Sequence, residues 1–217
     1  MNALLSNYPV PRLPKWRFWL PLILQILLII SVPAGVVHTY MTGKTVFLQT
    51  APVDPYSPIL GYSQILSYDI SRTETLKKLP GWKDFPKDNI GDGQEIRQEI
   101  KYDATVYVIL EAPSILATYP AYEPWRPVAI RTTPPTNLPD NQIYLKGKSK
   151  FNRIEYGMET YYMPEDRVRD INQEFATEQG IARDQEKLPP IVVEARINPQ
   201  GAGVPVSIWV RDRKYTF

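Results

Sequence analysis

The chain has 217 residues, a formal net charge of +2, no cysteine and a single histidine. The missing cysteines exclude disulfides, thiolate metal sites and cysteine nucleophiles, and one histidine excludes a histidine-based zinc site or catalytic triad. Lysines and arginines are scattered among acidic residues, which gives no basic footprint for nucleic acid. We therefore expect no metal, no cofactor and no nucleic-acid partner.

A single uncharged apolar run lies between Arg17 and Lys44 and predicts a transmembrane anchor over residues 18–40. About 20 apolar residues are enough to cross a hydrocarbon core of about 30 Å as a helix. We therefore expect an uncleaved, single-pass signal anchor that contacts the lipid bilayer. The alternative is a cleaved signal peptide with its cleavage site at residues 32–34, but the apolar run continues past that site to Val37.

The charges that flank the apolar run predict its orientation. The basic residues before it are Arg12, Lys15 and Arg17, and the only one close after it is Lys44. Because cytoplasmic flanks carry the excess of Lys and Arg, residues 1–17 should be cytoplasmic. Residues 44–217 should then form one exported domain on the periplasmic or thylakoid-lumenal side.

The exported part reads as a β-rich domain. Strand-like segments are expected at residues 44–50, 61–70, 104–110, 125–132, 142–149 and 151–163. The segment 104–110 is apolar on both faces, which favours a central strand. Residues 71–103 form a polar excursion with a short helix at 73–79, and residues 164–180 switch to the helical period.

The end of the chain gives the clearest local pattern. Inward-facing apolar residues alternate with polar ones on both sides of a turn at residues 198–201: Val193, Ala195 and Ile197, then Val204, Val206, Ile208 and Val210. This pattern predicts a β-hairpin with one buried face, and Pro205 favours an edge strand or a strand start. The predicted fold is a single N-terminal transmembrane helix plus an exported α+β domain with an antiparallel sheet and one main helix.

Two segments carry a resemblance to a known family. Residues 61–68 keep Gly61, Leu66 and Tyr68 of a Gly-Asp-Tyr-x-x-Leu-x-Tyr pattern, after an Asp54-Pro55 turn, and residues 156–165 match a second segment. The chain resembles the GDYXXLXY family of bacterial membrane-anchored proteins, and its excursion and tail look like the cyanobacterial branch. That family has no characterised function, so the resemblance implies topology and fold rather than mechanism.

The sequence departs from the family pattern where Tyr62 and Ser63 replace Asp and Tyr. A catalytic carboxylate would not tolerate exchange for a phenol, whose pKa is near 10. Either the family position is structural, or this chain has lost an activity that its relatives keep. We favour the first interpretation and treat the family-pattern residues as structural: Asp54, Pro55, Gly61, Leu66, Tyr68, Tyr156, Gly157 and Pro164.

Candidate binding residues are aromatic. The segment 119–125 combines proline with tyrosine and tryptophan, which make good interface anchors at low entropic cost. A carboxylate in the Tyr-rich segment needs a partner if it is buried. The candidates are Tyr119, Tyr122, Trp125, Tyr161 and Glu159.

The leading hypothesis is a non-enzymatic, membrane-tethered binding or assembly domain that contacts a membrane or envelope protein. The alternative is a cell-envelope hydrolase or a glycan-binding module. A signal-peptidase-like dyad would pair Ser57 or Ser63 with Lys101 or Lys146, because such enzymes activate a serine with a lysine. The segments that surround that dyad in signal peptidases are missing, and we assign no catalytic residue.

Overall fold

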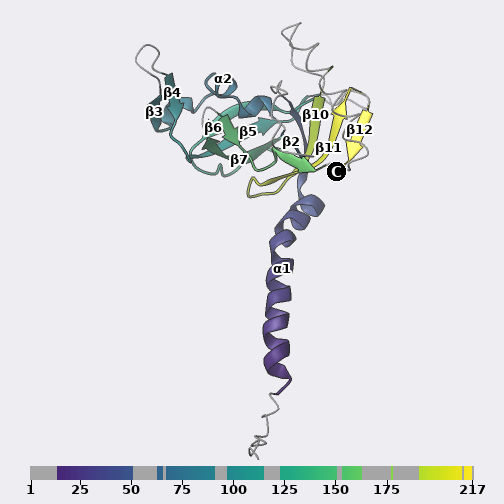
Figure 1. Cartoon of the computed structure of the whole chain (residues 1–217). Coiled ribbons are helices and arrows are strands. Elements are labelled where there is room, and N and C mark those ends of the chain that lie inside the picture. Colours follow the sequence, from purple (N-terminus) through teal and green to yellow (C-terminus); the bar gives the residue numbers. More distant parts are fainter. Residues whose placement is uncertain are drawn as a thin grey trace, which may run out of the picture. The chain divides into compact units, whose positions relative to one another are not determined.

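The computed structural model describes residues 14–50, 63–65, 67–90, 97–114, 123–150, 153–162, 177, 191–211 and 213–216. The chain divides into two compact units, residues 1–38 and residues 39–217. The first unit holds most of one long helix, and the second holds the β-rich domain (Figure 1).

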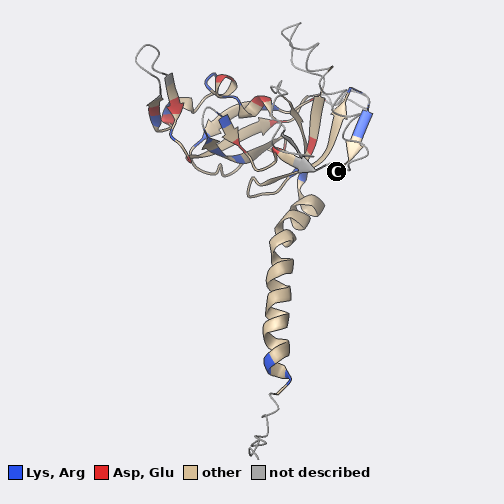
Figure 2. Ribbon diagram, viewed as in Figure 1, with Lys and Arg blue, Asp and Glu red and all other residues tan. Residues whose placement is uncertain are grey.

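The helix α1 (Trp16–Thr42) is 27 residues long and contains Pro21 and Pro33. Its side chains are almost all exposed and mostly apolar, and the helix is long and apolar enough to cross a membrane. At 1.5 Å per residue it extends about 40 Å, more than the hydrocarbon core of about 30 Å. Within this helix, Lys and Arg (blue in Figure 2) occur only at the N-terminal end.

One four-stranded antiparallel sheet is built from both ends of the domain, in the order β1-β10-β11-β12. Its strands are β1 (Lys44–Gln49), β10 (Ile191–Ile197), β11 (Gly203–Val210) and β12 (Arg213–Thr216). β1 follows α1 after one residue, Gly43, and pairs along its full length with β10.

The second four-stranded sheet has the order β6-β5-β7-β8. Its strands are β5 (Thr105–Glu111), β6 (Arg126–Arg131), β7 (Gln142–Lys150) and β8 (Arg153–Glu155). β5 is central, as its apolar sequence predicts. Because β6 and β7 both pair antiparallel with β5, they run parallel to each other, and residues 132–141 form a crossover between them.

In chain order, smaller elements lie between the strands of the two sheets. They are β2 (Ser63–Ile65) paired with β9 (Thr160–Tyr162), β3 (Lys87–Ile90) paired with β4 (Arg97–Ile100), the 3-10 turns η1 (Asp69–Ser71) and η2 (Trp82–Asp84), and the short helix α2 (Thr73–Leu76). The predicted fold class, a long apolar N-terminal helix with a β-rich antiparallel domain, is confirmed.

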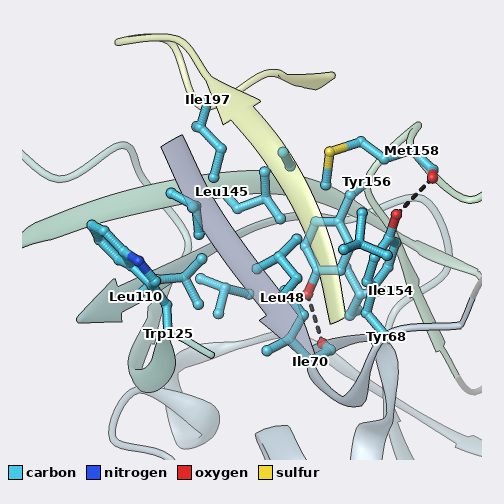
Figure 3. Packing of buried hydrophobic residues seen from close by; sticks show 14 of the residues in the cluster. Leu48, Tyr68, Ile70, Leu110, Trp125, Leu145, Ile154, Tyr156, Met158 and Ile197 are labelled. Atoms are coloured by element: carbon cyan, nitrogen blue, oxygen red, sulfur yellow. Dashed lines mark hydrogen bonds between the residues drawn. The ribbon is translucent and has the colours of Figure 1, made fainter. Parts of the chain in front are cut away.

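One hydrophobic cluster fills the domain and takes side chains from both four-stranded sheets (Figure 3). From the first sheet it takes residues such as Val46, Leu48 and Val193, and from the second Val108 and Leu145. The inward faces of the two sheets therefore share one core, and the connecting segment of η1 and α2 adds Ile70 and Leu76 to it.

Three predicted elements differ in the structure. Of the strand predicted at 61–70, the described residues form β2 and an isolated bridge at Tyr68. Its predicted end is wrong, because Asp69–Ser71 form a 3-10 turn that buries Ile70. The segment predicted at 151–163 is broken into β8 and β9, which belong to different sheets. The polar excursion contains the hairpin β3-β4, which the sequence did not predict. The helix predicted at 164–180 lies outside the described residues, apart from residue 177.

The predicted C-terminal hairpin is present as β10 and β11, and β10 alternates buried and half-buried residues as expected. The ladder has a bulge, because Glu194 faces Ser207 whereas Ala195 faces Pro205. Val206 is the extra residue and is only half-buried, so the prediction that it is buried is wrong. β11 is not an edge strand, but β12 pairs only with Ser207–Val210, which leaves Pro205 near the strand start.

Candidate functional site

Two segments that lie far apart in the chain come together beside the core. β2 pairs with β9 so that Gln64 faces Tyr161 and Ile65 faces Thr160. Just after β2, Tyr68 forms an isolated bridge with Thr50, at the end of β1. The two family-like segments of the sequence are therefore neighbours in space and connect to the strand that follows α1.

Two buried tyrosines link these segments through hydrogen bonds. Tyr68 and Tyr156 are 0% and 7% exposed, and both belong to the hydrophobic cluster (Figure 3). The Tyr68 hydroxyl donates to the carbonyl of Met158 over 2.7 Å, and the Tyr156 hydroxyl donates to the carbonyl of Ile70 over 2.6 Å. Burial, and the nearby Glu159 carboxylate, raise the pKa of the Tyr156 phenol well above its ordinary value. This phenol therefore stays neutral at physiological pH.

The turn after Tyr156 is held by a glycine and a carboxylate. Gly157 has φ +78°, a conformation that favours glycine, and the Glu159 carboxylate accepts a hydrogen bond from the Tyr156 backbone N–H. Arg153, six residues before Glu159, pairs with Glu155 over 2.7 Å. Glu159 therefore has a local partner in the backbone.

Small residues make room for this arrangement. A Cβ atom added at Gly147 on β7 would lie 2.9 Å from the Tyr156 ring and 2.4 Å from Cγ2 of Ile154. A Cβ atom at Gly203 on β11 would lie 2.2 Å from the Met158 sulfur. Both glycines bring a strand close to the tyrosine pair, a requirement that the sequence analysis did not identify.

The family model of the GDYXXLXY protein matches residues 25–208 of this chain. The chain belongs to the GDYXXLXY family. The search of the curated proteins gives no match, and no solved structure matches the chain. The matched range includes most of α1 and both paired segments.

The GDYXXLXY pattern residues that the structure describes take part in packing and backbone hydrogen bonds. They are Tyr68, Tyr156 and Gly157. The others lie outside the described residues: Asp54, Pro55, Gly61, Leu66 and Pro164.

Of the predicted binding residues, Trp125 is 8% exposed and belongs to the core cluster, so its ring packs inside the domain and not on its surface. Its backbone N–H donates to the carbonyl of Phe47 over 2.8 Å, which holds the residue beside β1, and the Lys44 ammonium lies 5.2 Å from its ring centroid. Tyr161 pairs with Gln64 through the backbone of β9. Tyr119 and Tyr122 lie outside the described residues.

The lysines considered for a serine–lysine dyad are both exposed. Lys101 lies just after β4, and Lys146 lies on the outward face of β7. A lysine that acts as a general base needs a desolvated environment, which neither position offers. Ser57 and the side chain of Ser63 lie outside the described part of the structure. Among the described residues, no group of three or more His, Asp or Glu side chains could hold a metal ion.

A polar cluster on the outward side of the first sheet was also missed. The Glu194 carboxylate accepts hydrogen bonds from the Ser207 hydroxyl over 2.6 Å and from the Lys214 ammonium over 2.9 Å. Burial alone would raise the pKa of Glu194, but these hydrogen bonds and the Lys214 charge lower it below its ordinary value. Glu194 faces Ser207 in the hairpin register, so the register gives the only signal for this contact.

The start of the domain is tied to the β10-β11 hairpin. The Asn198 amide donates to the Thr39 hydroxyl over 2.9 Å, and the Arg196 guanidinium donates to the Gly43 carbonyl over 3.1 Å. The Lys44 ammonium donates to the carbonyl of Asp140. These contacts all lie within residues 39–217 and fix the chain where it enters β1.

Proposed function

We propose that this chain is a membrane-tethered, non-enzymatic domain that binds a protein partner, or helps to assemble a membrane complex, on the periplasmic or lumenal side. The observation that carries the proposal is the direct passage from α1 into β1. Val46, whose side chain is in the core, follows Thr42 by four residues. Since a chain extends at most about 3.6 Å per residue, the core begins within ~15 Å of the end of α1.

Such a short connection has a functional consequence. If α1 crosses the bilayer, the domain cannot move away from the membrane surface, and it meets only what lies close to that surface. A soluble enzyme that samples distant substrates gains nothing from this restraint. A component that holds the membrane-proximal part of another protein does gain, because tethering raises its effective concentration there.

The proposed side of the membrane rests on the charge asymmetry around α1. Arg17, at the first turn, and the basic residues before it contrast with the single Lys44 that follows the helix. Protease treatment of intact spheroplasts should digest residues 44–217, whereas sealed cytoplasmic-side-out vesicles should protect them. Digestion of the domain only from the cytoplasmic side would reverse the proposed topology.

The experiment that tests binding is affinity purification of the full chain in mild detergent, with quantitative mass spectrometry. We expect at least one membrane protein to be enriched in near-stoichiometric amount. The sharpest variant carries a 12-residue Gly/Ser linker between Gly43 and Lys44. This linker allows the domain to move away from the membrane and releases the contacts of Thr39 and Gly43 with the hairpin, but it leaves the core sequence from Val46 onward unchanged. Recovery of the partner should fall, whereas the same linker before a C-terminal tag should leave it unchanged.

The proposal fails if wild-type chain enriches no protein above a control in which α1 alone is the bait. It also fails if the linker variant, folded as judged by its melting temperature, retains the partner at wild-type level. In that case the domain would act independently of its distance from the membrane.

A further inference from the structure

Three residues form a row across the outward face of the second sheet. Tyr107, on the central strand β5, faces Arg131 of β6 on one side and Lys146 of β7 on the other. Directly opposite residues on neighbouring strands have Cβ atoms about 5 Å apart. The two cations therefore flank the tyrosine at similar distances; we name these residues the Arg131 row.

The outward direction of the row follows from burial along β5. Val106 and Val108, on either side of Tyr107, are fully buried in the core cluster. Because side chains alternate along a strand, Tyr107 points to the opposite face, and it is half-buried there. Arg131 and Lys146 are both exposed.

The two cations of the Arg131 row have no acidic partner among the described residues, unlike the other cations of this sheet. Arg126 pairs with Glu123 over 2.7 Å, and Arg153 pairs with Glu155 over 2.7 Å. Lys148 and Lys150 both pair with Asp103, over 3.4 and 3.0 Å. Within the described part of the chain, neither Arg131 nor Lys146 makes a side-chain hydrogen bond or an ion pair, which leaves an uncompensated positive charge on each side of Tyr107.

Ring packing and hydrogen bonds hold the residues next to the row. The Tyr107 ring packs edge-on against Tyr144 with centroids 5.7 Å apart, and the Tyr144 hydroxyl donates to the carbonyl of Pro199 over 2.8 Å. The Ile130 backbone N–H donates to the carbonyl of Pro80, so the edge of β6 beside Arg131 is occupied. A ligand would therefore meet the face of the sheet through side chains rather than add a strand at this edge.

We propose that the Arg131 row docks an acidic segment of the partner protein, with carboxylates on Arg131 and Lys146 and an apolar contact on Tyr107. This inference rests on the proposed function and names the chemistry of the partner. Tyrosine and arginine are the residues that most often anchor protein interfaces, and arginine binds carboxylates in a bidentate manner. The row spans three strands with the tyrosine between the two cations. This spacing suits a peptide segment with separate carboxylates and an apolar side chain better than a single headgroup phosphate, which favours a protein.

The direct test uses the full chain in nanodiscs of neutral phosphatidylcholine. The probe is a fluorescein-labelled 12-residue peptide in which Glu alternates with Gly and Tyr, and the same peptide with Gln in place of Glu is the control. Fluorescence anisotropy should show binding of the Glu peptide that weakens as salt rises, and at least tenfold weaker binding of the Gln peptide.

The matched variants keep the change in charge equal. The double variant Arg131→Gln/Lys146→Gln should weaken binding of the Glu peptide at least tenfold. Lys148→Gln/Lys150→Gln removes the same charge from the same sheet but frees Asp103, and should change the affinity less than threefold. Tyr107→Ala should weaken binding several-fold, and Tyr107→Phe, which keeps the ring and the fold, should not.

Equal losses in the two double variants, or no binding of the Glu peptide by wild-type chain, would overturn the inference. The same holds if nanodiscs with phosphatidylglycerol abolish peptide binding by occupying the row, since a lipid would then be the ligand. The two proposals separate in the co-purification experiment. A partner that wild-type chain and Arg131→Gln/Lys146→Gln recover equally well refutes the Arg131 row alone, whereas the absence of any partner for wild-type chain refutes the proposed function.

Discussion

Tyr68 and Tyr156 each donate a hydrogen bond to the backbone carbonyl two residues after the other tyrosine. The bonds to Met158 and Ile70 join segments that are 90 and 86 residues apart in the chain. Each hydroxyl donates to a carbonyl that has little access to water. The two side chains therefore bury their rings in the core and also satisfy buried backbone acceptors. These two tyrosines of the GDYXXLXY pattern thus hold the fold together rather than present chemistry to solvent.

Removing one hydroxyl should therefore be costly. Tyr156→Phe leaves the Ile70 carbonyl unsatisfied in the core, and we expect a loss of about 1–3 kcal/mol in the free energy of unfolding. Tyr144→Phe, whose hydroxyl bond lies at an exposed position, should cost less than about 1 kcal/mol. Denaturant unfolding of the detergent-solubilised chain measures both. Equal losses of unfolding free energy in the two variants would show that the buried hydrogen bond stabilises the fold no more than the exposed one.

The same phenol predicts a weakness at alkaline pH. Its pKa is raised in the folded chain, so its contribution to stability is complete below the unfolded value near 10 and is lost as pH rises above it. Wild-type chain should lose up to about 1.4 kcal/mol per pH unit through this group above pH ~10. The Tyr156→Phe variant should show a shallower decline between pH 10 and 11.5. Parallel curves for the two proteins would mean that Tyr156 ionises freely in the folded state.

Most of the sheet could be predicted from the alternation of apolar and polar residues along each strand. β10 alternates because one face is buried, and that period is visible in Val193, Ala195 and Ile197 without any partner strand. The central place of β5 followed from its apolar character on both faces. The bulge opposite Glu194 is invisible in this pattern, because it depends on how two strands are aligned and not on either strand alone.

The parts that sequence reasoning missed depend on contacts between distant segments. The break between β8 and β9 is caused by the turn at Gly157. The Tyr-rich sequence around this glycine is typical of a continuous strand, so the break could not be predicted. Each strand of the β3-β4 hairpin has a single isoleucine among polar residues, so no apolar alternation marks it. The Arg131 row and the tyrosine pair each combine residues from strands or turns that the chain order separates, and no local period encodes that register.

The bulge in β11 gives a prediction with an internal control. Ile208 is 0% exposed, so Ile208→Asp places a carboxylate in the core and should cost about 4 kcal/mol or more. Val206, two residues earlier, is the half-buried bulge residue, and Val206→Asp should cost much less. Thermal unfolding of the two variants compares them directly. A similar melting temperature for both would place Val206 in the core after all.

A steric prediction concerns the space beneath Tyr156. Gly147→Ala would put a methyl group 2.9 Å from the tyrosine ring and 2.4 Å from Ile154, so β7 or the ring must shift. Overpacking of this kind typically costs about 1–3 kcal/mol. Gly35→Ala in α1 meets no atom within 4 Å and should leave stability unchanged or slightly higher. An unaltered unfolding midpoint in Gly147→Ala would show that this side of the core is loosely packed.

The Glu194 cluster predicts the response to acid. The pKa of Glu194 is lower in the folded chain than in the unfolded chain, so its contribution is present above the ordinary glutamate range and is lost as pH falls through the folded value. Ser207→Ala removes one hydrogen bond to the carboxylate and should reduce stability more at pH 7 than at pH 3. Ser149→Ala is the control, because that buried hydroxyl donates to the neutral Ile100 carbonyl, and its cost should not vary with pH. Urea unfolding at the two pH values measures the difference, and a pH-independent cost for Ser207→Ala would mean that Glu194 is not held in its ionised form by this contact.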